Sequence, residues 1–385
     1  PYSAFAFLAY SLGGPIGIAL AQAALVTTML AVFVTPLARQ SPWVLVAGAA
    51  FLTAVSGLPW YASFLMPDIF GGLVVLFGVF LVRDIDRLGF WATVLVLALA
   101  AFAATAHYGN IPLMVGVVVS ALAIRLLRRR FSWKSLVVGL IALVAAPIVN
   151  LGASAVVLDE ASVAPKRIPV LLTRSLDDGP ALWYLQDVCP EADLGLCIAY
   201  GDNITADTGE FLWSDTGVMS LPPELLDRIR DEELQVVMAA AMRYPMAQLN
   251  SFFGHSIHQL FRVGVEEIAV ADRMDDNFEP FITHAGPAKD LQDLFDKIIP
   301  LATFGSAIAL VAVALGFGLT PRWVDMIAIY MIGYGGNAFI YGGLSAPIDR
   351  YQGRTAWLIP VLLFVLVAEI MAERRRQTSG QLSRA

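Results

Sequence analysis

The segment SLVVGLIALVAAPIVNLGASAVV (135–157) contains 23 residues and no charge. Each helical residue advances ~1.5 Å, so roughly 20 apolar residues cross the hydrocarbon core of a bilayer. The segment therefore predicts a membrane-spanning helix. The basic stretch RLLRRRFSWK (125–134) precedes it, and Asp159 and Glu160 follow it. Because Lys and Arg beside a span are retained in the cytoplasm, this helix is expected to leave the cytoplasm toward its C-terminal end.

Eight further windows qualify, or nearly qualify, as spans by the same criterion. They lie at 15–36, 43–58, 69–82, 88–106, 111–127, 298–320, 323–345 and 355–372. The window 69–82 is the shortest. Proline and glycine inside several windows are tolerated, because neighbouring helices can satisfy the freed backbone groups. The sequence therefore predicts an all-α polytopic membrane protein with about nine transmembrane helices.

The distribution of charge divides the chain into three regions. The protein is 58% hydrophobic and only 15% charged, whereas about a quarter of an average soluble domain is charged. The segment 158–297 holds 25 of the 32 acidic residues and ten of the 25 basic residues, a formal charge of -15. We expect a membrane region at 1–157 with about six spans, an acidic, mostly helical extracytoplasmic domain at 158–297, and a membrane region at 298–385 with about three spans and a basic tail. Nucleic acid is excluded as a partner, because it would need a basic face.

The basic residues also predict which side of the membrane each connection occupies. Five basic sites fall on alternate connections of the nine-span count, so all five can be cytoplasmic at once. These sites are Arg39, Arg83 with Arg87, the cluster from Arg125 to Lys134, Arg322, and Arg374–Arg376. This arrangement predicts a multi-pass protein of a bacterial inner membrane, with 158–297 periplasmic and the C-terminus cytoplasmic. Pro1 then lies outside, and we expect an earlier span and an earlier outer loop to precede it.

Two cysteines in the large outer segment predict a disulfide. Cys189 and Cys197 are the only cysteines of the chain, and seven residues separate them. In an oxidising compartment this spacing allows a small closed loop. The alternative is a pair of buried thiols. A zinc site is disfavoured, because two cysteines without a nearby histidine are an incomplete ligand set.

Charged residues that touch the predicted spans are the candidates for function, because charge at membrane depth is costly. Asp68 precedes the third window and His107 ends the fourth, and both lie on the predicted outer side. A guanidinium fork is well suited to a phosphate, and a nearby carboxylate can take a proton from a hydroxyl group. We expect Asp68 and His107 to be catalytic. The expected substrate-binding residues are Asp349, Arg350, Tyr351 and Arg354, between the last two windows.

Each candidate has a second interpretation. Asp68 can cap the third helix by accepting from free N–H groups. His107 and Tyr108 can anchor the chain at the membrane interface. Arg350 and Arg354 can extend to phospholipid headgroups.

Other chemistries lack their motifs. The sequence contains no Walker loop, no H-E-x-x-H, no G-x-S-x-G and no dinucleotide fingerprint, so no cofactor and no metal are expected. The run GYGGN (333–337) lies inside an apolar window, where small residues favour close approach of helices over a ligand. Asn337 in that run needs a hydrogen-bond partner, and we expect it to face the bundle interior.

Three stretches carry a resemblance to a known family. They are PWYASFLMPDIF (59–70), AHYGNIPLMVG (106–116) and APIDRYQGRTAWLIP (346–360). With the opening YSAFAFLAYSLGG and Gln22, they resemble the bacterial multi-spanning glycosyltransferases of the GT-C type. The resemblance is spread over most of the spans, and its motifs are degenerate. It implies transfer of a sugar from a polyprenyl-phosphate carrier to an acceptor at the outer face of the inner membrane.

The resemblance also assigns roles by position. Arg350 or Arg354 would correspond to the contact with the carrier phosphate, and Asp68 or His107 would line the same cavity. In the family the catalytic acid lies in the first outer loop, and no such loop matches here. The resemblance implies two partners, the lipid bilayer and a polyprenyl-phosphate-linked sugar.

Two other functions fit the sequence. The acidic, helix-rich segment 158–297 fits a non-enzymatic subunit that binds other proteins of a membrane complex. A transporter is the third possibility, although the sequence has no inverted repeat and few ionisable residues within the spans.

Overall fold

The computed structural model of the chain describes residues 1–38, 43–159, 161–163, 167–189, 191–268, 271–274, 280–282 and 287–382. The chain divides into two compact units. The first, here the bundle unit, comprises Pro1–Ala153, Arg262–Asn337 and Ile348–Ala385. The second, the acidic unit, comprises Ser154–Phe261 and Ala338–Pro347.

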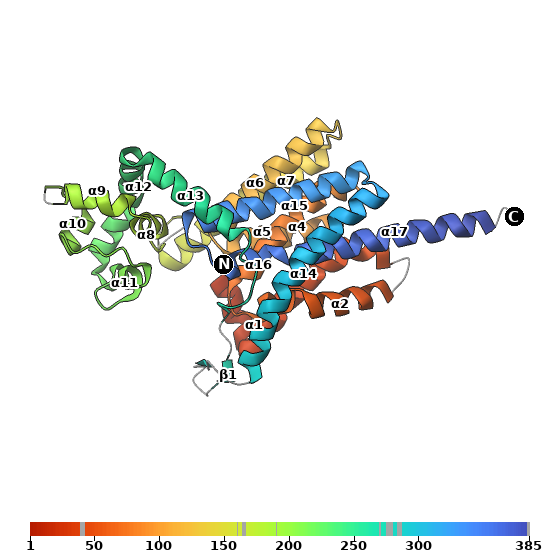
Figure 1. Cartoon of the computed structure of the whole chain (residues 1–385), viewed down its shortest axis with the longest axis horizontal. Coiled ribbons are helices and arrows are strands. Elements are labelled where there is room, and N and C mark those ends of the chain that lie inside the picture. The colour runs from red at the N-terminus through yellow and green to blue at the C-terminus, as the bar shows by residue number, and fades with distance from the viewer. Residues whose placement is uncertain are drawn as a thin grey trace. The chain divides into compact units, whose positions relative to one another are not determined.

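Helices dominate both units (Figure 1). The bundle unit contains α1 (Tyr2–Ala38), α2 (Trp43–Val55), α3 (Leu58–Ser63), the 3-10 helix η1 (Pro67–Ile69), α4 (Phe70–Arg83), α5 (Phe90–Ala106), α6 (Asn110–Leu127), most of α7 (Trp133–Leu158), α14 (Pro287–Phe317), nearly all of α15 (Pro321–Ala338), α16 (Asp349–Ala356) and α17 (Leu358–Leu382). The acidic unit contains α8 (Val170–Asp177), α9 (Pro180–Val188), α10 (Gly195–Tyr200), α11 (Thr208–Trp213), η2 (Val218–Ser220), α12 (Pro223–Arg243), α13 (Pro245–Gln259) and the π-helical turn η3 (Phe339–Gly343). A short antiparallel pair, β1 (Ala271–Met274) with β2 (Pro280–Ile282), is the one departure from helix among the described elements.

The division into units differs from the predicted boundaries. Most of both predicted membrane regions lies in one unit, whereas 154–157 and 338–347 belong to the acidic unit. Residues 262–297 also belong to the bundle unit rather than to the acidic domain. The reason is hydrogen bonding to α14. The amide of Gln292 donates to the carbonyls of Val265 and Ile268, each at 2.6 Å, and Asp296 accepts from the Val265 N–H at 2.7 Å. These bonds hold the segment that follows Phe261 on a helix of the bundle.

Long apolar helices indicate that the protein is embedded in a membrane. Each predicted window coincides with a helix of the structure, but five described helices are long and apolar enough to cross. These candidate spans are Tyr2–Leu37, Asn110–Leu127, Trp133–Leu158, Pro287–Phe317 and Asp349–Arg376. The helices α2 and α5 are apolar but shorter. The structure therefore supports a helical membrane protein, and the count of nine spans stays a prediction.

The helix α4 forms the centre of the bundle unit. It is 14 residues long, and every one of its residues is buried. A helix that is apolar on all sides is expected to be enclosed by protein. It contacts α5, α6 and α16. A Cβ built on Gly333 of α15 would lie 2.8 Å from the Val75 side chain, so the glycine allows the close helix approach expected from the sequence.

The basic residues of several connections form ion pairs at one end of the bundle unit. We call this the Arg83 end, because α4 ends there at Arg83. Arg83 pairs with Asp84 and Glu369, and Arg322 pairs with Asp84 at 2.6 Å. Arg125 pairs with Asp86. Four of the five basic sites that were predicted to be cytoplasmic thus lie at the same end of the unit. The fifth, Arg39, lies outside the described residues.

The acidic unit has a hydrophobic core of its own. Its buried residues come from helices α8 to α12 and are Leu172, Leu176, Ala181, Leu185, Leu196, Phe211, Leu212, Val218, Leu226, Ile229, Val236 and Ala240. The predicted disulfide is confirmed, since Cys189 and Cys197 are bonded with their Cα atoms 4.8 Å apart. Both cysteines pack against this core, and their bond closes the loop between α9 and α10.

One buried carboxylate fixes the start of α8. Glu233 of α12 is 2% exposed and accepts from the N–H groups of Leu171 and Leu172, at 2.9 and 3.2 Å. Arg167 pairs with its second oxygen at 3.2 Å. Burial raises the pKa of Glu233, while the two N–H groups and Arg167 oppose the rise. The carboxylate satisfies first-turn N–H groups that have no partner within α8.

Candidate functional site

The short helix α16 carries all four predicted substrate-binding residues and lies in the bundle unit. It lies against η1 and α4, and six of its eight residues are buried. A Cβ built on Gly71, in the first turn of α4, would lie 2.8 Å from Nε of Arg354. The Arg354 side chain therefore lies against the first turn of α4. The contacted residue, Gly71, is only three positions after Asp68 in the sequence. We call this the Asp68 end of the bundle unit, since α4 runs from here to the Arg83 end.

Arg354 is a buried cation that is held by hydrogen bonds to Asn337. It has no exposed surface, and its Nε and Nη2 both donate to Oδ1 of Asn337, at 3.0 and 2.8 Å. The Asn337 amide donates in turn to the carbonyl of Tyr351 and to Oε1 of Gln352, at 2.6 and 2.9 Å. The expectation that Asn337 faces the interior is confirmed. Because Arg354 is enclosed, the alternative that it extends to headgroups does not hold.

Asp68 lies in the electrostatic field of two arginines. Its side chain is 3% exposed. Burial raises the pKa of Asp68, and the guanidiniums of Arg354 and Arg350 counteract part of that rise. No side chain caps α4, so Asp68 does not act as its N-cap. The carboxyl group is therefore a buried, titratable group on which two cations act, which favours the chemical interpretation over the capping one.

His107 belongs to the same electrostatic group. It ends α5, and burial with the charges of Arg354 and Arg350 lowers its pKa to about 3. The ring is therefore neutral near pH 7. Its Nδ1 accepts from the Gly109 N–H at 3.1 Å, so the proton of the neutral ring is carried on Nε2. In this state His107 presents a hydrogen-bond donor at Nε2, not a proton acceptor.

Arg350 and Tyr351 occupy the beginning of α16. The guanidinium of Arg350 lies 5.1 Å from the centre of the Tyr351 ring, a cation–π distance. The charge of Arg350 acts on both Asp68 and His107. The structure thus brings together both residues predicted to be catalytic and both predicted arginines.

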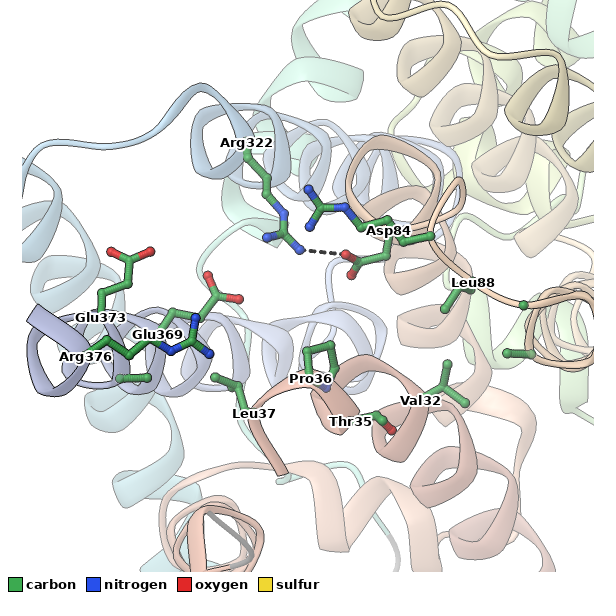
Figure 2. A pocket seen from close by; sticks show the side chains of 14 residues that line it. Val32, Thr35, Pro36, Leu37, Asp84, Leu88, Arg322, Glu369, Glu373 and Arg376 are labelled. Atoms are coloured by element: carbon green, nitrogen blue, oxygen red, sulfur yellow. Dashed lines mark hydrogen bonds and ion pairs between the residues drawn. The ribbon is translucent and has the colours of Figure 1, made fainter. Parts of the chain in front are cut away.

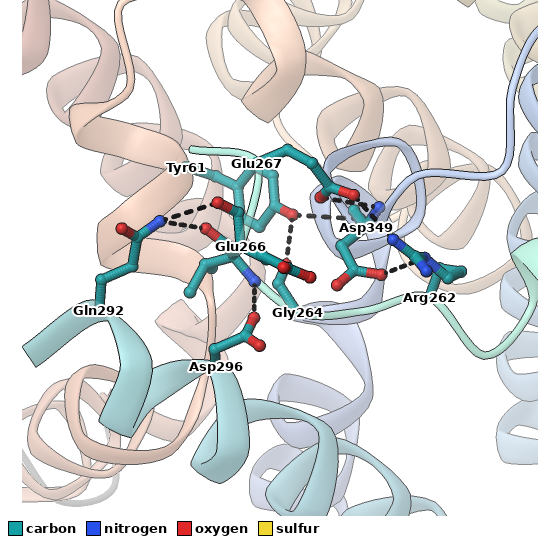
Figure 3. Close-up of polar contacts among 9 residues, drawn as sticks. Tyr61, Arg262, Gly264, Glu266, Glu267, Gln292, Asp296 and Asp349 are labelled. Atoms are coloured by element: carbon teal, nitrogen blue, oxygen red, sulfur yellow. Dashed lines mark hydrogen bonds and ion pairs between the residues drawn. The ribbon is translucent and has the colours of Figure 1, made fainter. Parts of the chain in front are cut away.

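A second polar network holds the start of α16 in place (Figure 3). The Tyr61 hydroxyl donates to the carbonyl oxygens of Gly264 and Asp349, at 3.0 and 3.3 Å. Nε of Arg262 pairs with the Asp349 carboxylate at 2.6 Å, and Glu267 accepts from both Arg262 and the Asp349 N–H, at 2.8 and 3.0 Å. Asp349 therefore anchors α16, and its contact with a substrate stays a prediction. Burial and the charges of nearby acids, led by Asp68, raise the pKa of Tyr61 well above its usual value, so it stays a donor.

Replacing Gly353 by alanine tests this anchoring. A Cβ at Gly353 would overlap the Tyr61 hydroxyl oxygen. We expect Gly353→Ala to lower the stability of the full chain by about 1–3 kcal/mol through overpacking, despite the better helix propensity of alanine. The measurement is the midpoint of thermal unfolding in detergent.

Gly335→Ala is the matched control, because nothing lies within 4 Å of a Cβ at that helical position. Adding Tyr61→Phe to Gly353→Ala should restore part of the loss, since it removes the overlapping oxygen. Equal midpoints for Gly353→Ala and Gly335→Ala would contradict the packing argument.

Three carboxylates near this network are close enough to hold a cation. The oxygens of Glu266, Asp296 and Asp349 lie within 4.8 Å of one another. Asp349 is already paired with Arg262, and Asp296 accepts from the Val265 N–H. These partners account for two of the three carboxylates without a metal.

Sequence reasoning missed the residues that support the site. Tyr61 and Gln352 lie inside the stretches that carry the family resemblance, but nothing in the sequence singles out their side chains. Arg262 and Glu267 were assigned to the acidic domain. Their role depends on contacts across 82 or more positions of sequence, which no local pattern reveals.

No protein-family model, curated protein or solved structure matches this chain.

Proposed function

We propose that the protein is a GT-C-type glycosyltransferase of a bacterial inner membrane. It transfers a sugar from a polyprenyl-phosphate carrier to an acceptor at the outer face. The proposal includes about nine spans, a periplasmic segment 158–297 and a cytoplasmic C-terminus. The alternate placement of the basic connections at the Arg83 end supports this orientation.

The observation that carries the proposal is the buried guanidinium of Arg354 at the beginning of α4, with its charge acting on Asp68. The N-terminus of a helix has a partial positive charge and favours anions. The guanidinium adds a full charge at the same place. With Arg350, these charges create a positive potential at one end of the helix bundle, which would attract the phosphate of a lipid carrier toward Arg350, while the enclosed Arg354 acts through its charge rather than by contact.

The remaining residues divide the chemistry. Asp68, when ionised, accepts the proton of the acceptor hydroxyl as that oxygen attacks the sugar, the general-base role. The carrier phosphate leaves with the electrons of the broken sugar–oxygen bond, and the arginines stabilise its charge. His107 stays neutral beside the two arginines and adds no charge to the site.

The test is turnover by the purified full-length protein in proteoliposomes. We expect release of free polyprenyl phosphate from a matching polyprenyl-phosphate sugar when an acceptor is present. Arg350→Ala should weaken carrier binding by about tenfold or more, since a hydrogen bond to a charged group contributes about 1.5–3 kcal/mol. Arg129→Ala, an exposed arginine in the connection between α6 and α7, is the control. No turnover with any carrier, together with unchanged carrier binding by Arg350→Ala, would refute the proposal.

A second candidate function, a non-enzymatic subunit of a membrane complex, rests on α13. Its exposed face carries apolar residues at helical spacing, with exposures between 48 and 68% for Met246, Leu249, Phe253 and Ile257. Exposed apolar surface of this kind marks contact sites. Stoichiometric co-purification of other subunits, without turnover, would favour this function.

A further inference from the structure

A cavity of about 560 Å³ opens at the Arg83 end of the bundle unit, opposite to Asp68 (Figure 2). Its lining comes from the last turns of α1, the connection that follows α4, the first turn of α15 and the C-terminal half of α17. Three of the basic sites contribute to the lining, through Arg87, Arg322 and Arg376. Because such charges are costly within hydrocarbon, the cavity is expected to lie at the boundary between the hydrocarbon core and water.

The floor of the cavity is a neutral ion-pair network. Arg322 pairs with Asp84 at 2.6 Å, and Asp84 also pairs with the buried Arg83 at 3.2 Å. Glu369 pairs with Arg83 and accepts from Nε1 of Trp323 at 2.9 Å. Two arginines and two carboxylates thus balance one another. Their mutual bonds hold the floor in one arrangement.

The rim carries an excess of positive charge. Arg87, Glu373 and Arg376 line the cavity and are exposed. No ion pair or side-chain hydrogen bond joins these three to any other residue in the described part of the chain. Two cations against one anion leave a formal charge of +1. A ligand with negative charge would complete the rim.

One wall of the cavity is apolar. Val32, Pro36 and Leu37 come from the end of α1, and Leu88 faces them from the connection after α4 (Figure 2). An inorganic ion would gain nothing from this wall. A ligand that joins a phosphate to hydrocarbon would place its charge on the rim and its chain beside α1.

We propose that this cavity binds the headgroup of an anionic phospholipid, with Arg87 and Arg376 contacting its phosphate. Guanidinium groups bind phosphate oxygens through paired hydrogen bonds, and basic pockets between helices at the cytoplasmic boundary suit such headgroups. The apolar wall assigns the phosphate to a lipid rather than to free phosphate. The site is separate from the Asp68 end and does not depend on the proposed glycosyltransferase activity.

Binding to the delipidated full chain in detergent tests the proposal. Dioleoylphosphatidylglycerol, dioleoylphosphatidylcholine and inorganic phosphate are titrated separately, and native mass spectrometry counts bound lipid while the thermal midpoint is followed. A ligand that binds the folded state raises the midpoint with its concentration. We expect phosphatidylglycerol to bind and to raise the midpoint. The double variant R87Q/R376Q should bind it at least about tenfold more weakly, from two lost surface charges.

Arg129→Gln removes an exposed arginine that does not line the cavity, and it should bind phosphatidylglycerol like the parent protein. Equal binding by the double variant and the parent would overturn the site. An equal response to phosphatidylcholine would overturn the anionic headgroup, and an equal response to inorganic phosphate would overturn the lipid. Counting lipid on the folded fraction keeps the comparison valid if a variant lowers stability.

Discussion

Under the proposed glycosyltransferase function, Asp68→Asn is expected to lower kcat/KM by about 10²–10⁴-fold, the usual contribution of a general base. Asparagine keeps the size of the side chain and its polar character, so folding should be retained in a position that is 3% exposed. What it removes is the group that accepts the proton. The measurement is release of polyprenyl phosphate at saturating and at limiting carrier concentrations.

The pH dependence of the proposed transfer reaction in the parent protein supplies an independent readout. Burial raises the pKa of Asp68. Its ionised fraction, and with it the activity, should therefore rise with pH through a value above the ~3.9 of an ordinary aspartate. Arg350 is one of the charges that oppose this rise, so Arg350→Ala should move the ascending limb to still higher pH.

The same pKa shift predicts the effect on stability. Because the folded state holds the proton of Asp68 more tightly than the unfolded state, protonation stabilises the fold. This stabilisation is complete below the unfolded pKa and is lost as pH rises through the folded pKa. Asp68→Asn should flatten that part of the stability profile.

The exposed Asp231→Asn on α12 is the control and should leave both profiles unchanged. An Asp68→Asn protein with the parent's kcat/KM and the parent's ascending pH limb would show that Asp68 accepts no proton in the proposed reaction.

Arg354→Ala is expected to be the most destabilising of the substitutions considered. It removes a fully buried side chain and deprives Oδ1 of Asn337 of two donors. Cavity formation and an unsatisfied buried acceptor together should cost about 3–5 kcal/mol. The variant should also lose carrier binding, since the guanidinium at the start of α4 is absent. Thermal unfolding in detergent and carrier titration measure the two effects.

A double-mutant cycle with Asn337→Ala separates the network from general packing. If Arg354 and Asn337 act through their shared hydrogen bonds, the losses should be non-additive by about 0.5–3 kcal/mol. Additive losses would mean that the bonds contribute little. Arg354→Lys should fold better than alanine yet recover little carrier binding, because an ammonium cannot make the paired contacts of a guanidinium.

Local features of the sequence were sufficient for the helices. The uncharged stretch 135–157 lies inside α7, and the apolar window 15–36 lies inside α1, after the kink at Gly13 and Gly14. The pair Cys189 and Cys197 was predictable because the two residues are close in sequence. In each case the determining interaction is with the membrane, with the chain's own backbone or with a near neighbour. Such interactions leave a pattern within about 25 residues of sequence.

The candidate site was predictable only in part. The cost of placing charge at membrane depth pointed to Asp68, His107, Arg350 and Arg354, and the structure places them within one electrostatic group. Composition suggested a boundary of the acidic domain near 297, but the division lies near Arg262. Charge composition reports exposure to water, whereas the hydrogen bonds of Gln292 and Asp296 decide which unit a segment joins.

By itself the sequence determined that the protein is helical, apolar and provided with charges at the ends of its spans, because hydrophobicity and helical period are properties of neighbouring residues. Only the tertiary structure decided that Arg354 is enclosed and bonded to Asn337, that Asp349 anchors α16 through Arg262, and that Tyr61 holds the same turn. These contacts join positions 17 to 288 residues apart. Their energies depend on burial and on distances of 2.6–3.3 Å, which exist only after the helices have packed.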